Sequence, residues 1–444
     1  MPSISNTCSV SWRVYQIPGT ALHDGIRWNW QTFPEFLDEL DTYEAVMDFA
    51  PQIGHAAVRS FVLGERCADP TYTPTEEEIS AMSDVVQEAV EAGAAGWSST
   101  FAPIHMDVHG NNVPGCFADL TEVLELAKAA ARGGYCIYEC AGAPGVSKNG
   151  MASLETIGKI MPVTYTLTEA GMEKSLAWLE KINKDGCQVI GQIFARAQGL
   201  LLGLNGVIQP LSVRSTTYLS MRELPLEERV AALRKADVRE AILREYDESK
   251  GKGVESVDGD PLTLLVSENF DNMWAMGGGA STMTFDYEPH PDQSIASLAK
   301  VRNVRPQEIL LDAMMEDDGH GIVWYPYSHG YTRRDYNNVR MGMEGAERGL
   351  CVLGNADAGA HVAAFTDASC TTFMLVTCYL HEHSVILLCV DCSELARCSC
   401  VCRHTGRETG HAGRSYRLRS SSNTTRGIRR GCMAGRIAVR SKSG

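Results

Sequence analysis

The sequence predicts an α/β fold in which helices alternate with the strands of a parallel sheet. Helical periodicity recurs along the chain, and short β-branched or aromatic runs separate the helical stretches. The chain has 444 residues, of which 44% are hydrophobic and 21% charged, so it can bury a sizeable core. The number of βα units favours a (β/α) TIM-like barrel over a doubly wound sheet.

The helices are predicted from amphipathic spacing and from residues that cap helix ends. Thr75 illustrates the signal, because its hydroxyl can cap a helix whose first turn carries Glu76, Glu77 and Glu78. The predicted helices cover residues 33–40, 75–92, 120–132, 171–184, 225–246, 295–301 and 306–315.

The strands are predicted from short runs rich in β-branched and aromatic residues between these helices. The predicted strands cover residues 96–100, 135–140, 162–167, 188–194, 262–266, 322–325 and 351–354. The glycine-rich residues 277–280 lead into no acidic partner at the spacing of a dinucleotide-binding motif, so we interpret them as a flexible loop.

The composition changes near residue 380 and divides the chain in two. From Tyr379 onward there are twelve Arg or Lys against four Asp or Glu, and Ser, Thr and Gly fill the spaces. Such a composition buries little apolar area. We therefore expect residues 1–384 to form the barrel domain and residues 385–444 to form a largely disordered, basic Cys/Arg/Ser-rich tail.

Charge and hydropathy exclude several classes of function. The net charge of −15 argues against nucleic-acid binding, because phosphate contacts need clustered Lys and Arg. No apolar run approaches the roughly 18 residues of a membrane-spanning helix, and the N-terminus lacks the features of a secretory signal. We expect a cytoplasmic protein with a small-molecule substrate, no membrane association and reduced thiols at its fifteen cysteines.

Asp357 is the strongest candidate for chemistry. It lies in the glycine-rich stretch 354–361, directly after the apolar run that ends at Leu353. In a barrel, this is the strand end at which reacting groups gather. The alternative is an Asx turn, in which Asp357 only hydrogen-bonds its own loop.

Several ordered motifs resemble the amidohydrolase-type N-acyl-D-amino-acid deacylases. Residues 355–362 (NADAGAHV) with 366–369 (TDAS) are similar to the final-strand segment of that family, and residues 28–37 (WNWQTFPEFL) resemble another of its passages. Residues 53–59 (IGHAAVR) and 92–99 (AGAAGWSS) agree as well. The resemblance runs in order from about residue 17 to about residue 375.

The resemblance implies a distorted barrel that holds one or two divalent metals, usually zinc, and hydrolyses an amide through an activated water. Asp357 would bind metal and carry the proton to the leaving nitrogen. Glu139 stands at a position where the family has a histidine ligand, whereas Leu167 stands at another and cannot bind metal. The family's opening H-x-H strand is not matched, so we expect the barrel to be incomplete at its N-terminal end.

Other residues are weaker candidates. Arg196 follows a predicted strand and would either clamp a substrate carboxylate or form an interior ion pair. His361 and Tyr325 are candidates for substrate contacts, although aromatic packing is the commoner role for Tyr325. His55 follows an apolar run, where a packed, hydrogen-bonded histidine is commoner than a reacting one. Further histidines and a tyrosine in strand-end loops are His105, His109, Tyr327 and His329.

The leading hypothesis is therefore a metal-dependent hydrolase that acts on a non-peptide C–N amide bond, such as that of an N-acyl-(D-)amino acid. Its metal ligands would include Glu139 and Asp357, and its cofactor would be zinc or another divalent metal. The alternatives are a catalytically inactive barrel homologue, or a truncated gene product, that binds a small ligand or a partner.

Overall fold

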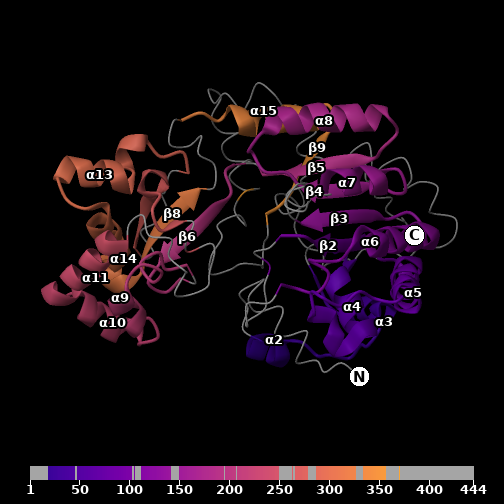
Figure 1. Ribbon diagram of the computed structural model, residues 1–444, viewed down its shortest axis with the longest axis horizontal. Helices are drawn as coiled ribbons and strands as arrows, with labels where there is room; N and C mark the ends of the chain where they lie inside the picture. Colours follow the sequence, from indigo (N-terminus) through magenta and orange to yellow (C-terminus); the bar gives the residue numbers. More distant parts are fainter. Residues whose placement is uncertain are drawn as a thin grey trace, which may run out of the picture.

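The computed structural model describes most of the chain up to residue 356. The described residues are 19–45, 48–102, 105, 112–141, 150–194, 196–206, 208–249, 263, 266–278, 287–326, 334–356 and 370. They form two sheets, which lie in separate parts of the molecule (Figure 1). The predicted tail of residues 385–444 lies outside the described residues.

The larger sheet has six strands, and every neighbouring pair in it is parallel. Its strands are arranged almost in sequence order, as β1-β2-β3-β4-β5-β9. A doubly wound sheet would instead reverse its order at a switch point. The strands are β1 (Gln52–Gly54), β2 (Gly96–Thr100), β3 (Ile137–Ala141), β4 (Val163–Thr166), β5 (Val189–Ile193) and β9 (Cys351–Leu353).

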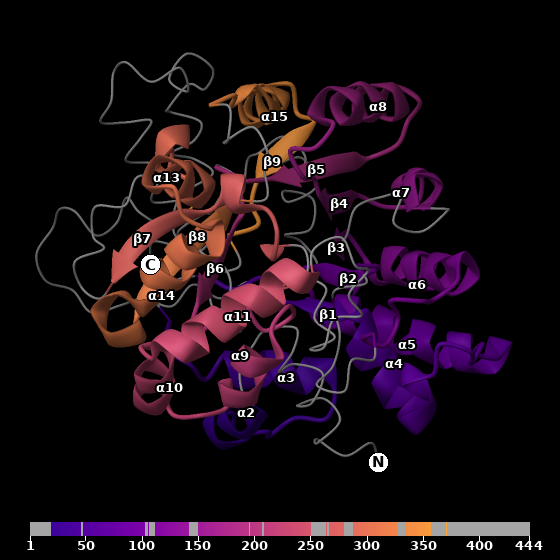
Figure 2. The same cartoon turned by 60° about the vertical axis from the view of Figure 1, so that its left-hand side comes forward.

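Helices connect these strands and lie on one side of the sheet (Figure 2). Crossovers between parallel neighbours are nearly always right-handed, so successive helices fall on the same face of the sheet. Within the described residues no pairing joins β1 to β9, so closure into a barrel stays a prediction. The helices are α4 (His55–Leu63), α5 (Glu76–Ala92), α6 (Leu120–Gly133), α7 (Gly150–Gly158), α8 (Met172–Lys184) and α15 (Asn337–Glu347).

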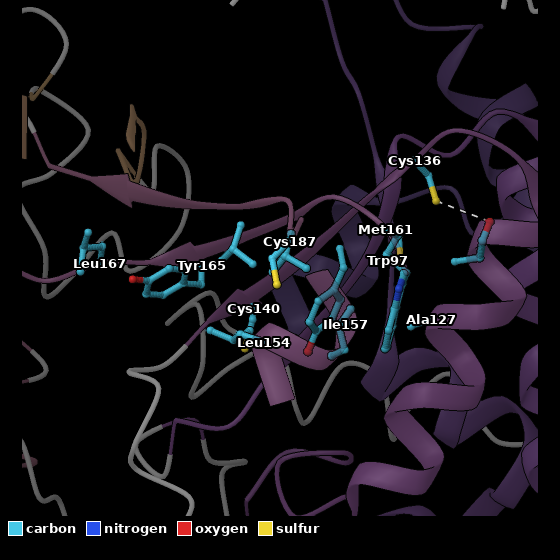
Figure 3. Packing of buried hydrophobic residues seen from close by; sticks show 14 of the residues in the cluster. Trp97, Ala127, Cys136, Cys140, Leu154, Ile157, Met161, Tyr165, Leu167 and Cys187 are labelled. Carbon is cyan, nitrogen blue, oxygen red and sulfur yellow. Dashed lines mark hydrogen bonds between the residues drawn. The ribbon is translucent and has the colours of Figure 1, made fainter. Parts of the chain in front are cut away.

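The helix-covered face of the larger sheet carries the first hydrophobic core. Trp97 and Tyr138 are both 0% exposed, and their rings stack with centroids 4.4 Å apart. Figure 3 shows Trp97, Met161 and Ile157 among the packed side chains of this core. Burial of this apolar area fixes which face of the sheet the helices cover.

The smaller sheet is antiparallel and has the order β6-β8-β7, with a second hydrophobic core packed against it. Its strands are β6 (Gly199–Gly203), β7 (Trp274–Gly278) and β8 (Gly321–Pro326). The helices that precede and follow these strands are α9 (Thr216–Met221), α10 (Leu226–Leu233), α11 (Ala236–Ser249), α13 (Ile295–Arg302) and α14 (Pro306–Gly319).

Short elements complete the described secondary structure. Two helices precede the sheet, and three 3₁₀ turns join other elements. They are α2 (Gly19–Gly25), α3 (Phe33–Leu40), η1 (Gly64–Ala68), η2 (Phe270–Asn272) and η4 (Pro291–Gln293). Among the described residues, no helix is both long enough and apolar enough to cross a membrane.

Several predicted elements match the structure closely. Thr75 caps α5 through a capping box with Glu78, as its sequence pattern predicts. The predicted strand at 96–100 and helix at 33–40 are confirmed with the same bounds. The predicted helix at 225–246 is instead two helices, α10 and α11.

Three other predictions are wrong. Gly277 and Gly278 do not form a flexible loop but belong to β7, where they pair with Ile322 and Gly321 beside a β-bulge. Residues 322–325 are a strand, but it runs antiparallel in the smaller sheet rather than in the parallel one. Thr263 and Val266, from the predicted strand 262–266, are helical.

Candidate functional site

The face of the parallel sheet opposite the helices carries a row of polar side chains. Successive side chains of a strand point to opposite faces of the sheet. Residues that alternate with the buried ones facing the helices therefore lie on this second face. The second face is only half-buried in β3, β4 and β5. Its row consists of Gln52, Ser98, Glu139, Thr164 and Gln192, one from each of five successive strands.

Glu139 is the charged member of the polar row, and two amide groups hold it. Gln52 donates from Nε2 to Glu139 Oε2 at 2.9 Å, and Gln192 donates from Nε2 to Glu139 Oε1 at 2.9 Å. Each carboxylate oxygen therefore has one neutral donor. A carboxylate offers about four lone-pair sites, so Glu139 keeps the capacity to accept further hydrogen bonds.

Gln192 extends this network to the neighbouring strands. Its Nε2 also donates to Thr164 Oγ1 at 3.1 Å, and its main-chain oxygen accepts from Asn355 Nδ2 at 2.8 Å. Asn355 adopts a left-handed conformation with φ of 55°, directly after Gly354. The hydrogen-bond network around Glu139 therefore reaches from Gln52 on β1 to Asn355, in the turn that follows β9.

The predicted catalytic residue, Asp357, lies outside the described residues, as do His361, His109, Tyr327 and His329. The last described residue before Asp357 is Ala356, in the segment that follows the Gly354–Asn355 turn. The structure leaves the predicted roles of Asp357 and His361 as predictions.

Leu167 fills a structural role at the end of β4. Leu167 is 5% exposed and packs directly against Gly191. A Cβ added to Gly191 would lie only 2.6 Å from Leu167 Cδ2. The glycine at 191 thus makes room for the leucine. This packing agrees with the interpretation that Leu167 contributes no metal ligand.

Arg196 and Tyr325 are both buried; Arg196 lies three residues after the end of β5. The Arg196 guanidinium stacks over the Tyr287 ring at 4.0 Å and donates to the main-chain oxygen of Ala197 at 3.1 Å. Tyr325 lies on β8 in the smaller sheet, where its hydroxyl accepts from Asn269 Nδ2 at 3.0 Å. Substrate contact by either residue stays a prediction.

His55 forms part of a buried ionic cluster with Glu122 and Arg59. His55 Nε2 lies 2.7 Å from Glu122 Oε1, and Arg59 Nη1 contacts both carboxylate oxygens at 2.7 and 2.6 Å. All three side chains are 1% exposed. Burial alone would raise the pKa of Glu122, but the His55 hydrogen bond and the charges of His55 and Arg59 outweigh it and lower that pKa. The prediction of a packed, hydrogen-bonded His55 is confirmed.

The carboxyl end of β2 holds one further histidine. Thr100 Oγ1 and His105 Nδ1 lie 2.6 Å apart. A shallow cavity of about 100 Å³ lies at the carboxyl end of β4, lined by Tyr165, Thr166, Leu167 and Thr168 among others. Ligand pockets for drug-sized molecules usually measure 300–1,000 Å³, so this cavity alone does not define a substrate site.

The described residues do not fit a zinc site by themselves. Among them, no group of three or more His, Cys, Asp or Glu side chains could hold a metal ion. The groups that contact Glu139 are the amides of Gln52 and Gln192, which turn N–H donors toward it rather than further ligand atoms. Zinc usually takes four ligands from His, Cys and carboxylate groups, and among the described residues the polar row offers only the Glu139 carboxylate.

Comparisons with known proteins show local similarity only. No family model matches the chain. A stretch of 95 residues is 34% identical to uncharacterized proteins of Mycobacterium tuberculosis and Mycobacterium bovis, covering 21% of this chain and 16% of theirs. A stretch of 119 residues is 30% identical to a D-aminoacylase of Alcaligenes xylosoxydans xylosoxydans, covering 26% of this chain and 22% of that protein. The chain therefore matches less than a quarter of the length of these curated relatives.

One solved structure also resembles the chain at a low level. It is an N-acyl-D-glutamate deacylase from Bordetella bronchiseptica, complexed with zinc and a phosphonate inhibitor. The sequences are 17% identical, the match covers 73% of this chain and 51% of the other, and the TM-score is 0.35. That TM-score is too low to show a shared fold.

The described residues define an α/β protein with a parallel sheet and a polar row on the face opposite its helices. The sequence indicated Glu139 only through the family resemblance, and it gave no indication of Gln52, Gln192 or Thr164. A single polar residue inside a short, otherwise apolar strand, as Glu139 in 137–141 (IYECA) and Gln192 in 189–193 (VIGQI), is the signal that could have found Gln192.

Proposed function

We propose that this protein hydrolyses an amide C–N bond in a small molecule, of the N-acyl-D-amino-acid class. The observation that carries this proposal is the 30% identity to a D-aminoacylase over 119 residues. The polar row supports it, because a half-buried carboxylate with fixed amide neighbours suits the binding of a polar, uncharged group such as an amide.

The proposed reaction adds water across the amide. The water oxygen bonds to the carbonyl carbon, the C–N bond breaks, and the nitrogen leaves as an amine after gaining a proton. Glu139 can accept a hydrogen bond from the water or from the substrate N–H through the lone pairs that Gln52 and Gln192 leave. Asp357 is proposed to carry the proton to the leaving nitrogen, as the family resemblance implies.

A divalent metal, with zinc as the first candidate, belongs to the proposal as a requirement to be tested. Glu139 alone among the described residues of the polar row carries a carboxylate, so a complete metal site would need Asp357 and further ligands.

We also propose that the six parallel strands form an arc of a TIM-like barrel and that residues 1–384 form one domain. The protein is proposed to be cytoplasmic, with neither nucleic acid nor membrane as a partner.

The test is an assay of the purified full chain on matched N-acetyl-D- and N-acetyl-L-amino acids, with detection of the released amine. The proposal predicts turnover of the D series, loss of turnover with a chelator, restoration by zinc, and loss in Asp357→Asn. No amine release from any substrate, with or without added zinc, cobalt or manganese, would contradict it.

A second candidate function is non-catalytic binding of a small amide. The packing of Leu167 over Gly191 favours it, because an apolar residue fills the position at which the resembled family has a histidine ligand. This candidate predicts that N-acetyl-D-amino acids raise the melting temperature of the protein and are recovered intact after prolonged incubation. Release of amine at a rate proportional to protein concentration would exclude it.

A further inference from the structure

Gln192 has an amide whose orientation is determined by its surroundings. Its Nε2 has two acceptors, Glu139 Oε1 at 2.9 Å and Thr164 Oγ1 at 3.1 Å. If the amide were flipped, its oxygen would face the Glu139 carboxylate, and two acceptors would oppose each other. The side chain therefore has one favourable arrangement.

This arrangement directs the other end of the amide at the turn after β9. A Cβ added to Gly354 would lie 2.9 Å from Gln192 Oε1, 3.5 Å from Cδ and 3.7 Å from Cβ. The Gln192 side chain thus packs directly on the Gly354 main chain. The main-chain oxygen of Gln192 also accepts from Asn355 Nδ2 at 2.8 Å, and the Gly354 N–H donates to Ile193 O at 3.0 Å.

Gln52 provides a natural comparison. It donates to Glu139 Oε2 at the same distance of 2.9 Å, but it lies on β1, at the other end of the sheet from β9. Loss of the Gln52 amide therefore removes one donor from Glu139 and leaves the contact with Gly354 in place. Loss of the Gln192 amide removes both.

We infer that Gln192 is a positioning residue that couples the Glu139 carboxylate to the Gly354–Asn355 turn. The effect of Gln192 on catalysis rests on the proposed function, in which Glu139 contacts the substrate or water and the turn leads to Asp357. Gln192 sets their relative position through contacts to β3, β4 and the turn. A side chain of similar size without an amide cannot hydrogen-bond Glu139 and Thr164, so it cannot hold Glu139 and the turn in fixed relative positions.

The first test measures hydrogen–deuterium exchange by mass spectrometry in full-length wild type, Gln192→Met and Gln52→Met. Gln192→Met removes the hydrogen bonds to Glu139 and Thr164 that hold the side chain packed on Gly354. It is therefore expected to raise the exchange rate of the peptide that covers residues 350–356 roughly fivefold to tenfold. Gln52→Met is expected to leave that peptide within about twofold of wild type. Gln87→Met, which removes a half-buried amide bonded to Glu91 and Arg132 far from β9 in the sequence, is the matched control.

A second perturbation acts on the same contact from the opposite side. Gly354→Ala places a Cβ against the Gln192 amide and is expected to raise exchange in residues 350–356. In a Gln192→Ala background the obstruction is removed, so Gly354→Ala is expected to have a much smaller effect there. Equal effects of Gly354→Ala in the two backgrounds would overturn the coupling.

The third test uses hydrolysis and separates this inference from the proposed function. If the wild type releases amine, Gln192→Met is expected to lower kcat roughly 10- to 100-fold with KM within about threefold, and to lower kcat more than Gln52→Met does. Equal kcat values for Gln192→Met and Gln52→Met would overturn the positioning role. An inactive wild type would overturn the proposed function, and the exchange measurements would still decide the coupling.

Discussion

Glu122→Gln tests the reasoning about the buried ionic cluster. The Glu122 carboxylate accepts both contacts from Arg59 Nη1 and the contact from His55 Nε2, and all three side chains are 1% exposed. Glutamine keeps the shape but removes the charge, which leaves the Arg59 guanidinium buried without a counter-charge from residue 122. Removal of one partner from a buried ion pair costs about 3–5 kcal/mol of unfolding free energy.

Glu125→Gln is the matched control on the same helix. Glu125 pairs with Lys128 at 2.7 Å, but the two side chains are 43% and 50% exposed. Exposed pairs contribute about 0.2–1 kcal/mol, so the control should cost less than about 1 kcal/mol. Urea unfolding followed by circular dichroism measures both variants. A cost for Glu122→Gln no larger than that for Glu125→Gln would refute the account of the cluster.

The pH dependence of unfolding gives a second measure of the same cluster. The pKa of Glu122 is lowered in the folded protein from its ordinary value of 4.5. The stability that this carboxylate contributes is therefore fully present above about pH 4.5 and is lost as the pH falls through the lowered pKa. The difference in unfolding free energy between wild type and Glu122→Gln should shrink as the pH drops below about 4.5, and a constant difference would contradict this linkage.

Three further predictions follow from the packing. Leu167→Ala should lower the unfolding free energy measured in urea by about 3 kcal/mol, because it opens a cavity above Gly191 on β5. Gly199→Ala should lower the melting temperature by several degrees, since its Cβ would fall on the Trp324 indole, whereas Gly25→Ala, with open space around it, should not. The thiols of Cys136 and Cys351 should resist iodoacetamide at pH 8 in the native protein, because burial raises the pKa of each to about 12; mass spectrometry of the alkylated peptides would show modification if this is wrong.

Local signals in the sequence predicted much of the parallel half of the fold. Thr75 marks a helix start because its cap and the following acidic turn lie within four residues, and both partners of the capping box are local. The strands at 96–100 and 188–194 were predictable because each is a short stretch with aromatic or β-branched residues between two helical patterns.

The antiparallel sheet was harder to predict because its pairing joins distant segments. β6 pairs with β8 across more than a hundred residues, and Gly277 in β7 has a φ of 86° beside a bulge, a conformation that suits glycine. Glycine-rich sequence with that conformation resembles a loop when it is considered without its partner strand.

The polar row was only partly predictable for the same reason. Glu139 was a candidate through the family resemblance, but its hydrogen bonds to Gln52 and Gln192 depend on the register of β1, β3 and β5. The distances along the chain are 87 and 53 residues, so no local pattern indicates these pairs. Glu122 was not a candidate, because an acidic residue in the first turn of a helix usually indicates a favourable interaction with the helix dipole rather than a buried ion pair.

The central claim is that the polar row around Glu139 supports amide hydrolysis. Its most direct test is the kcat/KM of Glu139→Gln for an N-acetyl-D-amino acid. Glu155→Gln is the control, because Glu155 pairs with Lys159 at 3.5 Å on helix α7. The account predicts a loss of at least about 100-fold for Glu139→Gln and no significant change for Glu155→Gln. A Glu139→Gln variant that keeps wild-type kcat/KM would contradict the claim.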